Sequence, residues 1–177
     1  MTRSNLEHII RAAGTIADDP DIIVIGSQAV LGQYPTADAA LLVSMEADVY
    51  PRNRPERSDL IDGSIGEGSP FAREFGYYAH GVDAATAVLP EEWQDRLVLV
   101  SGPNTRGVRG WCLDIHDLAI AKLVAGREKD LEFVRILAKH SYVTVAVLGE
   151  RLRKTELEPP RRNLIEGRLA AIASMNK

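Results

Sequence analysis

Apolar and polar positions follow a helical period at the start of the chain. Four apolar residues recur three or four positions apart and predict a helix over about residues 4–17: Leu6, Ile9, Ile10 and Ala13. A β-branched apolar run predicts a strand over 21–25, and the small residues of 27–33 predict the helix after it. A second apolar run predicts a strand over about 40–49, which Tyr50-Pro51 should end because proline cannot continue a central ladder.

The rest of the chain changes from short mixed elements to helices. The pattern predicts a short helix over 59–65, a helical turn over 71–75, a strand with an irregular end over 77–90, a strand over 97–100, a hairpin turn at 101–104 and a strand over 110–113. Four helical segments follow, over about 115–125, 129–140, 143–154 and 161–173. This order predicts an α/β (α+β) core over 1–113 and a C-terminal helical region over 114–177 packed on that core.

Composition narrows the class of protein. A chain of 177 residues can bury one core with a helical appendage, but it is too short for two large independent domains. No apolar run is long enough to span a bilayer and Met1-Thr2-Arg3 does not open a signal peptide, so a cytoplasmic protein without membrane association is expected. The single cysteine, Cys112, excludes an internal disulfide and is expected in the core. A net charge of −4 argues against a uniformly basic nucleic-acid coat.

Two features suggest phosphate and metal chemistry. Gly26 lacks a Cβ, so a phosphate can approach the backbone there, and the hydroxyl and N–H of Ser27 can donate to it, although a plain strand-to-helix turn would have the same sequence. Glu46 and Asp48 are two positions apart, so on a strand they share one face and can bind one cation. The alternative for this pair is a solvated strand edge.

A third carboxylate often completes such a metal site. Asp83 is the candidate here, in competition with Asp95, which is more simply a turn residue, and Asp114, which is more simply a helix cap. His80 and His116 have no second ligand at metal-binding spacing, so each is expected to be a structural or surface histidine.

Gly26-Ser27 before a helix, followed by Glu46-x-Asp48, resembles the nucleotidyltransferase fold of the polymerase-β type. The stretch from Leu113 to Lys122 and the turn Arg127-x-Lys129-Asp130 look similar to the lysine-containing helix and turn of AbiEii-type toxin nucleotidyltransferases. The resemblance covers most of the chain and implies a mixed sheet flanked by helices. One departure is Glu46, because the family usually has aspartate at that position.

The resemblance also implies roles for individual residues. Glu46, Asp48 and Asp83 would hold Mg²⁺ or Mn²⁺ as catalytic metal ligands, and Gly26, Ser27 and Lys122 would bind the triphosphate, with these groups converging on one cleft. Lys122 would be a catalytic and nucleotide-binding residue. The alternative is that its side chain extends to the surface. Arg127 and Lys129 would lie at the mouth of the site, and Asp130 would either orient Lys122 or complement a helix dipole.

The implied function is transfer of a nucleoside monophosphate from an NTP to an acceptor. The resemblance implies an RNA acceptor such as tRNA, or a protein acceptor, and a toxin–antitoxin setting with an antitoxin partner. The alternative is a non-catalytic nucleotidyltransferase-fold module that binds nucleotide or protein. A dinucleotide-binding domain is disfavoured because Ile25-Gly26-Ser27-Gln28-Ala29 lacks the required glycine spacing.

Basic residues gather in two parts of the chain, and each group would contact the phosphates of an RNA acceptor or form a solvated face. They are Arg52, Arg54, Arg57, Arg106 and Arg109 in the first part, and Arg151, Arg153, Lys154, Arg161 and Arg162 in the last part.

Overall fold

A computed structural model describes residues 1–175 and divides the chain into two compact units. The first unit comprises 1–86 and 97–114, and the second comprises 87–96 and 115–177. The segment 87–96 belongs with the helical unit because its contacts are there: the amide of Glu91 donates to the carbonyl of Lys154 at 2.8 Å, and Arg96 pairs with Asp117. The C-terminal helical region therefore includes a segment from the middle of the sequence.

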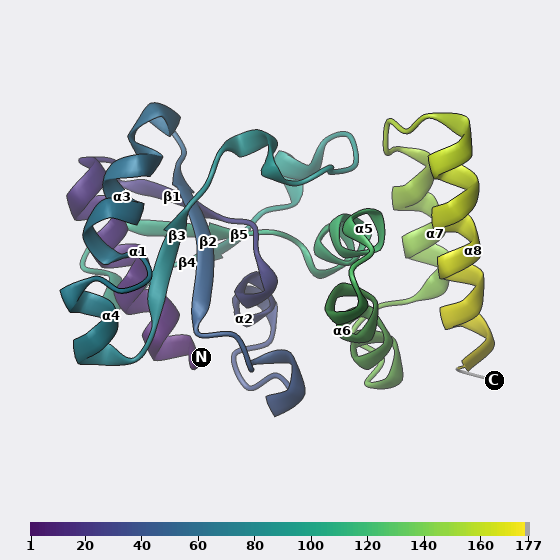
Figure 1. Cartoon of the computed structure of the whole chain (residues 1–177), viewed down its shortest axis with the longest axis horizontal. Helices are drawn as coiled ribbons and strands as arrows, with labels where there is room; N and C mark the ends of the chain where they lie inside the picture. Colours follow the sequence, from purple (N-terminus) through teal and green to yellow (C-terminus); the bar gives the residue numbers. More distant parts are fainter. Residues whose placement is uncertain (176–177) are drawn as a thin grey trace. The chain divides into compact units, whose positions relative to one another are not determined.

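The first unit is built on a five-stranded mixed sheet, which confirms the expected α/β class (Figure 1). Its strands are β1 (Asp21–Val24), β2 (Glu46–Pro51), β3 (Tyr78–Gly81), β4 (Val98–Val100) and β5 (Arg109–Cys112), in the order β3-β2-β1-β5-β4. The pairs β2–β3 and β1–β5 are parallel, whereas β1–β2 and β4–β5 are antiparallel. The long crossover between β2 and β3 contains two helices, as a parallel pair requires.

Three helices pack on one face of this sheet. A Cβ on Gly110 of β5 would meet Ile10 of α1 (Arg3–Ala17), and one on Gly32 of α2 (Val30–Gln33) would meet Cys112. A Cβ on Gly81 of β3 would meet the backbone of α3 (Ser58–Ile65). Side chains alternate between the two faces of a sheet, so the residues between these positions project from the opposite face.

The helical termini follow ordinary capping chemistry. Thr2 and Asn5 form a capping box at the start of α1, and Asp18 ends it in a left-handed conformation. The hydroxyl of Ser69 accepts from the amide of Ala72 at the start of α4 (Pro70–Phe75), which Gly76 ends with φ 74°. The first unit also contains short 3₁₀ helices: η1 (Ser27–Ala29), η2 (Ala39–Leu41), η3 (Pro55–Arg57), η4 (Ala84–Thr86) and η6 (Pro103–Thr105).

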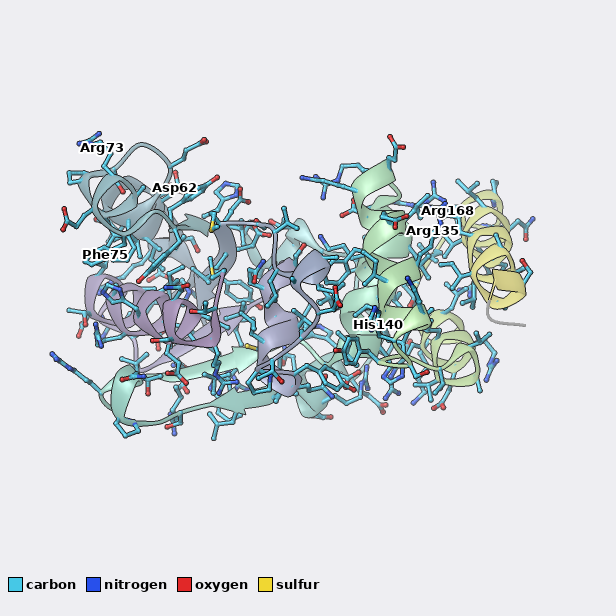
Figure 2. All side chains as sticks on the ribbon, turned by 90° about the horizontal axis from the view of Figure 1, so that it is seen from below. Asp62, Arg73, Phe75, Arg135, His140 and Arg168 are labelled. Carbon is cyan, nitrogen blue, oxygen red and sulfur yellow. The ribbon has the colours of Figure 1, made fainter. Side chains whose placement is uncertain are left out.

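The second unit is helical. It contains η5 (Trp93–Arg96), α5 (Ile115–Ala125), α6 (Glu128–Lys139), α7 (Val145–Arg153) and α8 (Pro159–Met175). Arg168 of α8, labelled in Figure 2, donates to the carbonyl of Leu123 at 2.6 Å and covers Gly126, whose φ of 67° ends α5. A guanidinium at this end of α5 complements the helix dipole.

A carboxylate buried in the second unit holds two arginines. Asp117 is fully buried in α5, and it accepts from Nε of Arg96 at 2.8 Å while Nε of Arg151 lies 3.2 Å from its other oxygen. The arginines come from η5 and α7, so this ion triad connects three segments of the unit. Removal of the carboxylate would leave two guanidiniums facing each other.

Most element positions agree with the sequence pattern, but β2 does not. The apolar run before Glu46 was expected in the strand, whereas β2 begins at Glu46 and the preceding residues include η2 and the exposed Val43 and Met45. The strand includes Tyr50 and, as expected, ends at Pro51. The Cα of Pro51 pairs with Ile22, and β3 pairs only as far as Val49, so a residue without an N–H is tolerated there.

None of the helices within residues 1–175 combines the length and the apolar character needed to cross a bilayer.

Candidate metal and nucleotide site

Three potential metal ligands meet on the face of the sheet opposite α1, α2 and α3. Glu46 and Asp48 project from the same face of β2, because Ala47 between them is fully buried on the helix-covered side. The parallel register places Tyr78 opposite Glu46 and His80 opposite Asp48. One ligand atom from each of Glu46, Asp48 and His80 lies within 4.8 Å of the others, and no other such group of three occurs among the described residues.

The imidazole of His80 lies between the two carboxylates. Its Nδ1 is 3.4 Å from Oδ1 of Asp48 and 3.5 Å from Oε1 of Glu46. The hydroxyl of Tyr78 donates to Oε2 of Glu46 at 3.2 Å, so the other carboxylate oxygen faces His80. His80 is about half exposed, which leaves this side of the cluster open to solvent.

The pKa of Glu46 lies below its ordinary value. Burial alone raises this pKa, but hydrogen bonding with Asp48 and Tyr78 and the nearby His80 outweigh burial. The ionised form of Glu46, which binds cations, is therefore the favoured form near neutral pH. The pKa of Tyr78 is raised, first by burial and then by the Glu46 charge, so its hydroxyl remains a donor.

The Gly26 turn is in direct contact with this cluster. A Cβ on Gly26 would overlap the side chain of Asp48, including its Cβ and Cγ. The amide of Ile25 donates to the carbonyl of Asp48 at 3.0 Å, and Nε2 of the fully buried Gln28 donates to the carbonyl of Ser44 at 3.1 Å. Gly26 is thus required for a close approach rather than for an unusual backbone angle, since its φ is −83°. Gln28 was not recognised as a site residue from the sequence.

The other candidate carboxylates have different positions. Asp83 is exposed after β3, where Oδ1 accepts from the amide of Ala85 at 2.7 Å and starts η4. Asp83 does not belong to the group of three ligand atoms. Asp95 lies in η5 of the second unit, and Asp114 immediately precedes α5. His80 was expected to be a structural or surface histidine, because the sequence shows no second ligand at metal-binding spacing, whereas the strand register brings it beside Asp48.

The predicted phosphate-binding lysine belongs to the second unit. Nζ of Lys122 lies 3.0 Å from Oδ1 of the buried Asp130, whose other oxygen accepts from Nε of Arg127 at 2.6 Å. The Lys122 ammonium also lies 5.6 Å from the ring centre of Phe133. Asp130 therefore orients Lys122 through an ion pair, one of the two roles expected for it, whereas Lys129 is exposed in the first turn of α6.

Asp130 remains ionised because of these two partners. Burial by itself disfavours its carboxylate, but hydrogen bonds and charges from Arg127 and Lys122 outweigh burial and hold its pKa below the ordinary value. The three charged groups form a fixed cluster at the junction of α5 and α6.

Several arginines that were considered for RNA binding make contacts within the protein. Arg54 and Arg57 pair with Asp18, and Arg109 pairs with Asp21 at 2.6 Å. Arg52 lies over the ring of Trp111, 5.2 Å from its centre. In the second unit, Arg151 pairs with Asp117, Lys154 pairs with Glu92, and Arg162 donates to the carbonyls of Leu152 and Thr155.

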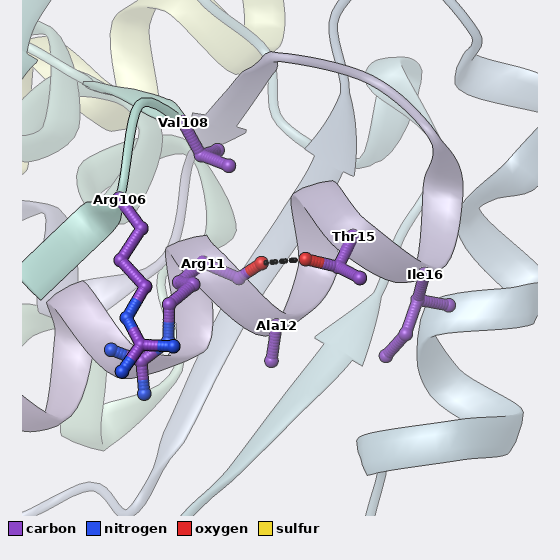
Figure 3. A pocket seen from close by; sticks show the side chains of 6 residues that line it. All are labelled: Arg11, Ala12, Thr15, Ile16, Arg106 and Val108. Carbon is purple, nitrogen blue, oxygen red and sulfur yellow. Dashed lines mark hydrogen bonds between the residues drawn. The ribbon is translucent and has the colours of Figure 1, made fainter.

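A separate hollow of about 380 Å³ lies between α1 and the turn before β5 (Figure 3). It is lined by Arg11, Ala12, Thr15, Ile16, Arg106 and Val108, and the hydroxyl of Thr15 donates to the carbonyl of Arg11 at 3.0 Å. This hollow lies at the β5 end where Arg109 pairs with Asp21, the start of β1, whereas Asp48 bonds to Ile25 just beyond the other end of β1. It is therefore not part of the metal cluster.

The donor set of the cluster fits a divalent cation. Donor atoms bound at about 2.1 Å lie about 3.0 Å apart in an octahedron and about 3.4 Å apart in a tetrahedron. The separations of 3.4 and 3.5 Å around His80 lie at and just beyond the upper end of this range, and both exceed the length of a charge-assisted hydrogen bond, about 2.8 Å. Two carboxylates and an imidazole, whose ligand atoms all lie within 4.8 Å of one another, could therefore hold one ion between them.

A sheet with a glycine turn packed against an acidic pair is the arrangement that the nucleotidyltransferase resemblance led us to expect. The model of the family DUF6036, described as a nucleotidyltransferase of unknown function, matches residues 4–157. The chain therefore belongs to this nucleotidyltransferase family. No curated protein and no solved structure matches the chain.

Proposed function

We propose that the protein transfers a nucleoside monophosphate from an NTP to an acceptor, with Mg²⁺ or Mn²⁺ held by Glu46 and Asp48. The observation that carries the proposal is the packing of Gly26 against the Asp48 side chain. This contact joins the turn suited to a phosphate with the carboxylates suited to a metal, and nucleotidyl transfer needs both next to each other.

Each residue has a defined task in this reaction. The turn at Gly26 and Ser27 binds phosphate oxygens through backbone N–H groups and the Ser27 hydroxyl. Glu46 and Asp48 hold the cation, which when bound neutralises charge on the triphosphate. The acceptor oxygen forms a bond to the α-phosphorus while the bond to the pyrophosphate oxygen breaks, so pyrophosphate leaves and the acceptor loses its proton.

Lys122 is assigned to the triphosphate on the family resemblance. Its ammonium is held by Asp130 at 3.0 Å and is largely buried, so little side-chain entropy remains to be lost when an anion binds. Arg127 shares Asp130 and is more exposed, which suits a contact with the outer phosphates. Lys122→Met in α5 should weaken NTP binding, whereas Lys139→Met, a change at the C-terminal end of α6, should not.

Metal-dependent nucleotide binding tests the proposal. Two ionised carboxylates repel a triphosphate unless a cation neutralises them, so calorimetry should detect ATP, GTP, CTP or UTP with Mg²⁺ or Mn²⁺ but not with EDTA. Asp48→Asn should abolish the metal-dependent part of NTP binding. Asp59→Asn, which removes an exposed carboxylate from α3, should leave it intact. Equal binding of NTP with and without metal would contradict the proposal.

The proposed acceptor is an RNA such as tRNA, or a protein, and the proposed setting is a toxin–antitoxin pair in the cytoplasm. The support is the likeness to AbiEii-type proteins in the Lys122 helix and the Arg127-x-Lys129-Asp130 turn. Expression of the wild type should arrest growth, and co-expression with a neighbouring antitoxin gene should relieve the arrest. Growth arrest that persists in Asp48→Asn would argue against a toxin that acts by nucleotidyl transfer.

A non-catalytic binding module is the second candidate. Two observations favour it: Glu46 occupies a position where the family usually has aspartate, and an imidazole rather than a third carboxylate lies opposite Asp48. Glu46→Asp separates the two candidates. In a working enzyme shaped around glutamate the shorter side chain should slow transfer, whereas in an inactive module it should change nothing or create activity.

A further inference from the structure

His80 changes the chemistry of the cluster from oxygen donors alone to oxygen and nitrogen. The register of β2 and β3 fixes its position, since His80 pairs directly with Asp48 and the two side chains share one face of the sheet. Its Nδ1 is almost equally far from the two carboxylates, at 3.4 and 3.5 Å. An atom placed symmetrically between two acidic groups is positioned to share a cation with both.

The neighbouring contacts favour this orientation. The Tyr78 hydroxyl occupies Oε2 of Glu46 and leaves Oε1 on the His80 side. Gly26 packs against Asp48 from the first turn after β1, which limits how far that side chain can move. Hydrogen bonds and packing around metal ligands typically orient them in this way.

Donor type decides which ion the cluster prefers. Mg²⁺ takes oxygen ligands almost exclusively, whereas imidazole nitrogen suits first-row transition metals. Within that series the affinity of a given site rises from Mn²⁺ onward, and of these ions Mn²⁺ most resembles Mg²⁺ in accepting carboxylate, phosphate and water oxygens. One nitrogen with two carboxylates is therefore a ligand set that discriminates against Mg²⁺.

We infer that His80 is the third ligand of the metal site, through Nδ1, and that the site consequently binds Mn²⁺ in preference to Mg²⁺. The inference rests on the proposed function for the choice of a divalent cation, but the ligand atom is assigned from the geometry of β2 and β3. It replaces Asp83, which immediately precedes η4, as the third group of the site.

The probe is Mn²⁺ without nucleotide. Titration of the full chain followed by electron paramagnetic resonance measures bound Mn²⁺, and electron spin echo modulation detects a nitrogen bonded directly to it. The wild type should show ¹⁴N modulation, and Mg²⁺ should displace Mn²⁺ only at an excess of about tenfold or more. His80→Gln should lose the modulation and weaken Mn²⁺ binding by at least about tenfold.

Two further variants separate ligation from other effects. His80→Asp supplies an oxygen in place of nitrogen, so it should retain a metal and shift the preference toward Mg²⁺ by about tenfold or more. His140→Gln, which removes a histidine at the end of α6, should leave both the modulation and the affinity unchanged. Circular dichroism and urea unfolding of each variant establish that it is folded.

The results distinguish this inference from the proposed function. Bound Mn²⁺ without ¹⁴N modulation, or modulation that persists in His80→Gln, would overturn the role of His80 even if NMP transfer occurs. A His80-dependent nitrogen signal in a protein that transfers no nucleotide would support the ligand assignment and count against the enzyme.

Discussion

Gly26→Ala tests whether the glycine turn and the acidic pair form one site. The backbone at Gly26 has φ −83° and ψ −172°, which alanine adopts without strain, so the effect of the change is confined to the added methyl group. That methyl would overlap Cβ, Cγ and Oδ2 of Asp48. Rotation of the terminal carboxylate cannot relieve an overlap with Cβ, so the Asp48 side chain or its strand must move.

The expected loss follows from this movement. Disturbing a group that orients a metal ligand typically weakens metal binding by about 10–100-fold, which corresponds to about 1.4–2.7 kcal/mol. Overpacking also costs about 1–3 kcal/mol of folding stability, and the partial exposure of Asp48 places this change at the lower end of that range. Metal affinity should therefore fall clearly while the protein remains folded.

Calorimetric titration with Mn²⁺, together with urea unfolding, measures both effects. Gly63→Ala is the matched control, because no atom lies within 4 Å of a Cβ at this position in α3. It should leave metal affinity unchanged and stabilise the helix by about 0.5–1 kcal/mol. If Gly26→Ala binds Mn²⁺ as tightly as the wild type does, the contact between the turn and Asp48 has no role in the site.

Three further predictions concern the rest of the molecule. The pKa of Asp130 is depressed in the folded protein, so its contribution to stability is complete above the unfolded pKa of about 3.9 and is lost as pH falls through the folded pKa. In urea unfolding below about pH 4, Asp130→Asn should therefore reduce the dependence of the unfolding free energy on pH. Asp117→Ala should destabilise the second unit by about 3 kcal/mol in urea unfolding, because two partly buried arginines lose their counter-ion, whereas Glu150→Ala at an exposed pair should cost less than about 1 kcal/mol. Burial raises the pKa of the Cys112 thiol to about 12, so a chromogenic disulfide reagent at pH 8 should label it only as fast as the protein unfolds, and rapid labelling of the native protein would contradict its buried position.

Local sequence patterns predicted the helices better than the strands. The helical period of Leu6, Ile9 and Ile10 placed α1 to within one residue, and α5 was placed at its observed bounds because Gly126 ends it. The β2 start was misplaced because apolar side chains before Glu46 look like a buried strand, although Val43 is 74% exposed. Periodicity in a short apolar run cannot tell a strand from an irregular segment that enters one.

The candidate site could likewise be predicted only where its residues share one strand, because local spacing does not reveal which strands pair. Glu46 and Asp48 were found because both belong to one strand, where spacing alone puts them on one face. His80 lies 32 residues after Asp48, and only the parallel register of β2 and β3 brings the two together. The β1 to α2 turn is likewise joined to the segment just before β2 by a hydrogen bond from Gln28 to Ser44, a contact that no local pattern contains.

The position of the transferred label tests the central claim most directly. The protein is incubated with Mn²⁺ and with RNA or protein fractions, using NTP labelled at either the α- or the γ-phosphate, and the acceptors are then separated. Nucleotidyl transfer predicts label on an acceptor from the α-phosphate only, release of the γ-label as pyrophosphate, and loss of both signals in Asp48→Asn. Transfer of the γ-label, or α-labelling that survives Asp48→Asn, would contradict the account.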